Sequence, residues 1–102
     1  MLSDAQHTYL DHKEAFLDQF IDEGSDHALF ISSYIHGHFS VVAANMPAGI
    51  DALDSFASTF EDALYSTIKT AIADGELASE DAQAVLNMLD KMFSKPATGG
   101  NN

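Results

Sequence analysis

Apolar side chains recur every three or four positions in four segments of the chain, a spacing typical of helices with one buried face. The segments lie near residues 4–23, 26–46, 52–74 and 80–94. The third is the most regular, with apolar or small side chains at Leu53, Phe56, Ala57, Phe60, Ala63, Leu64, Thr67, Ile68 and Ala71. The connections are short, and no segment reads as a strand. We therefore predict an all-α, single-domain, antiparallel four-helix bundle in residues 1–94.

Residues that favour helix ends separate these segments. Gln6 follows Ser3 by three residues, which has the form of a capping box. Pro47 disfavours helical geometry just before it and limits the second helix, and Asp74-Gly75 ends the third. N-caps are expected at Ser3, at Ser25 or Asp26, at Asp51 and at Ser79. The last residues, 95–102 (KPATGGNN), have nothing to bury, so we predict a disordered tail.

The second segment differs from the others because it carries no charge after Asp26. No Asp, Glu, Lys or Arg occurs from His27 to Ile50, although the chain of 102 residues has a net charge of −12. The stretch exceeds the ~20 residues that a membrane span needs, but it is interrupted by Ser32, Ser33, His36, His38, Ser40 and Asn45. We therefore interpret it as the central helix of the bundle.

The overall charge excludes some classes of partner. Four basic residues against 16 acidic ones cannot neutralise a run of phosphates, so we expect no binding to nucleic acid or to anionic membranes. A basic protein partner remains compatible with this charge, although an acidic surface also serves solubility alone. The N-terminal segment lacks the basic and apolar regions of a secretory signal, so we expect a cytoplasmic protein.

A helical projection of the second segment, at about 100° per residue, predicts which side chains are buried. The predicted core arc holds Phe30, Ile31, Tyr34, Ile35, His38, Val41 and Val42. His38 lies near its middle, with Tyr34 and Asn45 close by, so these three are the candidate buried polar residues. His36 points the other way and is expected to be exposed. Buried phenol and imidazole groups need hydrogen-bond partners and most often fix how helices pack.

The other side of the second segment consists of small or apolar residues at Leu29, Ser33, Gly37, Phe39, Ser40 and Ala44. A helix that is apolar or small nearly all round is usually covered. The commonest cover is a second copy of the same protein. We therefore expect a homodimer with these six residues at its interface. The rival explanation is that the chain's own N-terminal residues or tail fold over this side.

The five histidines raise the question of a metal site. His36 and His38 are two residues apart, so a helix points them in nearly opposite directions. The Glu-x-x-His pairs of di-iron bundles are absent. The run around Gly75 resembles part of a calcium loop, but Ile72 would occupy a ligand position. With no cysteine, no Gly-x-Ser-x-Gly motif and no phosphate-binding loop, we expect no metal or cofactor and assign no catalytic residue.

Two parts of the sequence resemble the YfcL-like family of small gammaproteobacterial proteins. The first is Tyr34-Ile35-His36-Gly37-His38, preceded by Leu29-Phe30. The second is the run Ala71-Ile72-Ala73-Asp74-Gly75-Glu76-Leu77, followed by Asp81, Val85, Met88 and Phe93. The resemblance covers roughly residues 10–94. It implies a cytoplasmic helical bundle and brings no activity with it.

Two functional hypotheses follow. The favoured one is a non-enzymatic protein-interaction module that self-associates and engages a protein partner. The alternative is a small-molecule-binding or catalytic bundle that uses a buried Tyr34 and His38 pair. A cavity of roughly 300 Å³ or more beside His38 would favour the alternative, since this is the low end for ligand sites.

Overall fold

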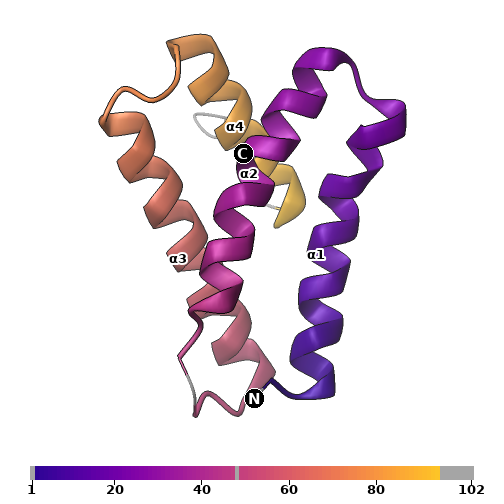
Figure 1. Ribbon diagram of the computed structural model, residues 1–102. Coiled ribbons are helices and arrows are strands. Elements are labelled where there is room, and N and C mark those ends of the chain that lie inside the picture. The colour runs from indigo at the N-terminus through magenta and orange to yellow at the C-terminus, as the bar shows by residue number, and fades with distance from the viewer. Residues whose placement is uncertain (1, 48, 95–102) are drawn as a thin grey trace.

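The computed structural model describes residues 2–47 and 49–94, which form four helices and no strand (Figure 1). The helices are α1 (Asp4–Glu23), α2 (Asp26–Ala44), α3 (Leu53–Ala73) and α4 (Ser79–Met92). These bounds confirm the predicted all-α fold with four helices. The predicted tail at residues 95–102 lies outside the described residues.

The start of α1 and the start of α2 agree with the predicted caps. The Ser3 hydroxyl accepts a hydrogen bond from the backbone N–H of Gln6, and the Gln6 side chain accepts one from the backbone N–H of Ser3. Ser25 caps α2 by accepting from the backbone N–H of Ala28. Each of these contacts satisfies a backbone donor that the first helical turn leaves unpaired.

The predicted caps of α3 and α4 are wrong by one residue. Ala52 and Ala78 occupy the N-cap positions, and neither helix has a side-chain cap. Ser79 is instead the first residue within α4, and Asp51 precedes the cap of α3 by one residue. At the other end of α3, Gly75 has a φ of 84°, a left-handed conformation that glycine adopts without steric cost.

α2 is the central helix, as predicted from its lack of charge. It packs against each of the other three helices. In Figure 1, α2 lies between α1 and α3, and α4 passes behind it. Three sides of α2 are therefore occupied by its own chain, and the fourth side faces solvent.

The core is built around the regular apolar stripe of α3. Phe56, Phe60, Leu64 and Ile68 follow one another at intervals of four residues and are all buried. The Phe60 ring meets the Phe39 ring of α2 edge-on at 5.0 Å. The other helices add buried apolar residues at Leu10, Leu17, Ile31, Ile35, Val85, Leu89 and Met92. Among residues 2–47 and 49–94, no helix is long and apolar enough to cross a membrane.

Candidate interaction surface on the central helix

The orientation of α2 about its axis differs from the predicted one. Its buried residues are Ile31, Ser32, Ile35 and Phe39. Phe30 and Val41, which were predicted to lie in the core, are 47% and 62% exposed. At about 100° per residue, the centre of the buried arc is displaced by roughly 70° from the predicted centre. The prediction was wrong because a helix with no charged residue after its first position, Asp26, offers no strongly polar face to orient it.

This rotation corrects the assignment of two candidate residues. Phe39 was predicted at the interface, but it is 4% exposed and belongs to the core. Asn45 was predicted to be a buried polar residue, but it is exposed at the end of α2. Its side-chain amide donates to the backbone carbonyl of Val41 at 2.7 Å, so it closes the helix instead of joining the core.

From Leu29 to Ala44, the solvent-facing side of α2 carries no charge and is more apolar than predicted. We call it the uncharged face, and it consists of exposed residues only: Leu29, Phe30, Ser33, Gly37, Ser40, Val41 and Ala44. Five of these were predicted as interface residues. Phe30 and Val41 were missed, although their spacing of seven and four residues from Gly37 fits one face of a helix.

Gly37 lies in the middle of the uncharged face and has no packing role within the chain. A Cβ atom built at this position would meet no heavy atom within 4 Å. A glycine inside a helix is less stable than alanine by roughly 0.5–1 kcal/mol. The fold of a single chain therefore does not explain why a glycine stands there.

An open groove follows one edge of the uncharged face. It has a volume of about 510 Å³ and is lined by Ser33, Tyr34, Gly37, His38, Val41 and Thr67. Tyr34 and His38 were predicted to be buried, but both are only partly buried. The Tyr34 hydroxyl donates to the Glu76 carboxylate at 2.9 Å, and His38 Nδ1 lies 3.3 Å from the Thr67 hydroxyl oxygen.

The chemistry of Tyr34 bears on whether this groove is a catalytic site. Partial burial, followed by the hydrogen bond and the charge of Glu76, raises the pKa of Tyr34 to about 12. The phenol therefore stays protonated at neutral pH. General acid–base catalysis works best with a pKa near the operating pH. Tyr34 lacks this property, and its hydroxyl is already engaged by a carboxylate.

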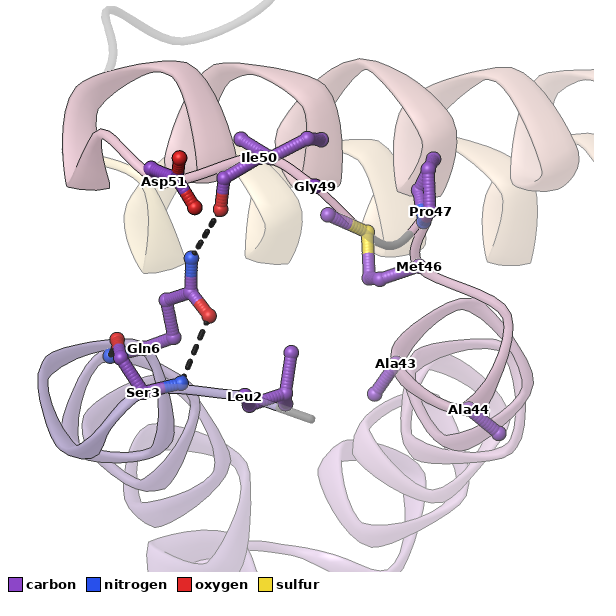
Figure 2. A pocket seen from close by; sticks show the side chains of 10 residues that line it. All are labelled: Leu2, Ser3, Gln6, Ala43, Ala44, Met46, Pro47, Gly49, Ile50 and Asp51. Atoms are coloured by element: carbon purple, nitrogen blue, oxygen red, sulfur yellow. Dashed lines mark hydrogen bonds between the residues drawn. The ribbon is translucent and has the colours of Figure 1, made fainter.

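Figure 2 shows the side chains that line a second cavity. It has a volume of about 320 Å³ and lies among the start of α1, the end of α2 and the connection to α3. Gln6, which is 4% exposed, spans one side of it. Its amide nitrogen donates to the Ile50 carbonyl at 2.7 Å, while its oxygen accepts from Ser3, so both ends of the amide are engaged.

Two further histidines join α2 to its neighbours. His36 Nε2 lies 2.7 Å from a carboxylate oxygen of Glu14 in α1, and His27 Nε2 lies 2.8 Å from one of Asp81 in α4. His36 was predicted to be exposed but is half-buried. These partners lie 22 and 54 residues away in sequence, so helical periodicity does not indicate them. No group of three or more His, Cys, Asp or Glu residues in the described part of the chain is placed to hold a metal ion.

Comparisons with known proteins identify the family of this chain. The family described as YfcL protein matches residues 7–94. The curated relative named "Uncharacterized protein YfcL", from Escherichia coli (strain K12), is 30% identical over 81 residues, which cover 79% of this chain and 85% of the relative. No solved structure gives a significant match. The fold and these matches agree with the resemblance of the sequence, and the chain belongs to the YfcL family.

Proposed function

We propose that the protein is a non-enzymatic interaction module that pairs with a second copy of itself through the uncharged face of α2. One observation carries the proposal: this exposed face holds large apolar side chains and no charge, in a chain of net charge −12. Leu29, Phe30 and Val41 are 37%, 47% and 62% exposed. Exposed apolar clusters of this kind are typical of surfaces that bind another protein.

Charge favours a second copy as the occupant of this face. Two chains of net charge −12 repel each other, so they associate most readily where neither carries an acid. The outer faces of α1 and α3 do carry exposed acids, among them Asp11, Asp18, Asp54 and Asp62. The uncharged face is free of such residues. It is therefore the region where apolar contact between two copies meets least repulsion.

The proposal has two less specific parts. The exposed acids of α1 and α3 leave a surface that suits a basic protein partner, and binding there would weaken with rising salt. The sequence has no cysteine, which fits the reducing conditions of the cytoplasm, and we propose this location for the protein. Cell fractionation tests the location, and recovery in the membrane or periplasmic fraction would contradict it.

A charge introduced into the uncharged face tests the pairing. In Ser33→Glu, each copy gains one acid at the proposed contact, and the dissociation constant should rise at least about tenfold. Ser66→Glu is the matched control, because it makes the same change at an exposed position of α3 that does not line the groove. Sedimentation measures both, with circular dichroism to check folding. Equal dissociation constants for Ser33→Glu and the natural chain would overturn the proposal.

The groove beside His38 favours a second candidate function, binding of a small molecule. Its volume of about 510 Å³ exceeds the roughly 300 Å³ of small ligand sites. However, the groove is open to solvent, and its phenol is paired with Glu76. Nuclear magnetic resonance with a library of small fragments tests this candidate. Shifts confined to Tyr34, His38 and Thr67 would support it, and no shift there would exclude it.

A further inference from the structure

The side chains of the uncharged face are arranged with a symmetry about Gly37. Phe30 and Ala44 each lie seven residues from Gly37, about 10.5 Å along the helix in opposite directions. Ser33 and Val41 each lie four residues away, about 6 Å in opposite directions. At both distances a large side chain on one side of Gly37 corresponds to a small one on the other.

We infer that two copies pair in an antiparallel arrangement about a two-fold axis that passes beside Gly37. This inference rests on the proposed function and specifies its geometry. The axis places Phe30 of each copy against Ala44 of the other, and Val41 of each copy against Ser33 of the other. Large side chains then fill the space left by small ones at four points of one contact, as a self-complementary two-fold interface requires.

Gly37 has a defined role in this arrangement. Packed helices lie 8–10 Å apart, and the lower end requires small residues at the contact. At Gly37 the two backbones meet each other without an intervening side chain. Because a Cβ atom here would meet nothing within the same chain, the glycine serves an approach from outside.

A parallel pairing fits these residues less well. It would set Phe30 against Phe30 and leave Gly37 opposite Gly37, so that the largest residues hold the helices apart where the smallest need contact. It would also bring the two Asp26 side chains together. In the antiparallel pairing, Asp26 at the start of α2 faces the charge-free end of the other copy, and the helix dipoles oppose each other.

Disulfide trapping tests the geometry, because the chain has no cysteine and each introduced one is unique. A disulfide needs Cα atoms within about 7 Å. Ser33→Cys mixed with Val41→Cys should crosslink at least about tenfold faster than either variant alone, since like positions lie about 12 Å apart along the helix. Gly37→Cys should crosslink by itself. Ser66→Cys, exposed on α3, is the control for random collision.

The outcomes separate the geometry from the proposed function. The antiparallel pairing is supported if the mixture of Ser33→Cys and Val41→Cys crosslinks, if Gly37→Cys crosslinks by itself, and if Ser33→Cys and Val41→Cys each crosslink little alone. Crosslinking of Ser33→Cys with itself and of Val41→Cys with itself shows a parallel pair and overturns this inference, while pairing through α2 stands. A dimer by mass that crosslinks no more than Ser66→Cys overturns the inference and places the interface elsewhere. A monomer at every concentration overturns both.

Discussion

The replacement of Gln6 by Ala should destabilise the protein more than the loss of one polar side chain usually does. Gln6 is 4% exposed and holds two parts of the fold that are distant in sequence. Its oxygen completes the capping box at Ser3, and its nitrogen donates to the carbonyl of Ile50, 44 residues away. Figure 2 shows both hydrogen bonds beside the cavity between α1, α2 and the connection to α3.

The magnitude follows from these two bonds. Each bond contributes about 0.5–1.5 kcal/mol net, and the partly buried Ile50 carbonyl, left without this donor, adds to the loss. We expect the free energy of unfolding to fall by about 2–3 kcal/mol. With a urea slope of about 1–1.5 kcal/mol per molar for a domain of this size, the midpoint should fall by about 2 M. Gln19→Ala is the control, since Gln19 is exposed and bonds only within its own helix.

The variant Gln6→Glu adds a pH-dependent form of the same test. A carboxylate can still accept from Ser3 but cannot donate to Ile50. Burial should raise the pKa of the new carboxyl above its unfolded value of about 4.3. A group with a raised pKa stabilises the fold below its unfolded pKa and loses that effect as pH rises through the folded pKa. The difference in the free energy of unfolding between Gln6→Glu and the natural chain should therefore become smaller near pH 4.

Urea unfolding at one protein concentration, at neutral and acidic pH, measures both variants against the natural chain. If Gln6→Ala is as stable as Gln19→Ala, or the Gln6→Glu difference does not become smaller on acidification, Gln6 does not hold the loop as described.

The remaining predictions concern tyrosines, histidines and metals. Burial raises the pKa of Tyr9 and of Tyr34 to about 12, and that of Tyr65 is raised as well. The stability that these protonated tyrosines contribute should therefore be complete below about pH 10 and lost as pH rises above it. Tyrosinate absorbance should appear together with unfolding. Titration of the tyrosines near pH 10 in the folded protein would contradict this expectation. His36 and His38 are both partly buried. Replacing either by Ala should therefore lower the free energy of unfolding in urea by less than about 1 kcal/mol. The predicted orientation of α2 implied instead a much larger loss for His38 than for His36. Excess chelator, calcium or zinc should leave the thermal midpoint unchanged, and a chelator-induced drop of several degrees would reveal a structural metal.

The sequence predicts the helices well because their signals are local. The capping box at Ser3 and the limit set by Pro47 each lie within one or two helical turns, and the stripe of α3 repeats at each turn of one continuous helix. The lack of charge in α2 also predicts its central position correctly, since a helix in contact with three others has little room for ionised groups. These features depend on residues that are neighbours in sequence.

The orientation of α2 depends on contacts that the sequence does not display. Ser32 is buried and Phe30 is exposed, the reverse of what hydropathy favours. Ser32 is accommodated because its hydroxyl donates to the Leu29 carbonyl within the same helix at 3.1 Å. The side of α2 that meets α3 is fixed by the Phe39–Phe60 contact, which joins two helices. The partners of Tyr34 and His38, Glu76 and Thr67, were missed for the same reason.

The central claim is that the uncharged face of α2 joins two copies of the chain. Sedimentation equilibrium of the natural chain, from micromolar to millimolar concentration at physiological salt, tests it most directly. We expect a mass that rises from the 11.0 kDa of the monomer towards twice that value and no further. A mass that stays at 11.0 kDa throughout this range would contradict pairing through α2.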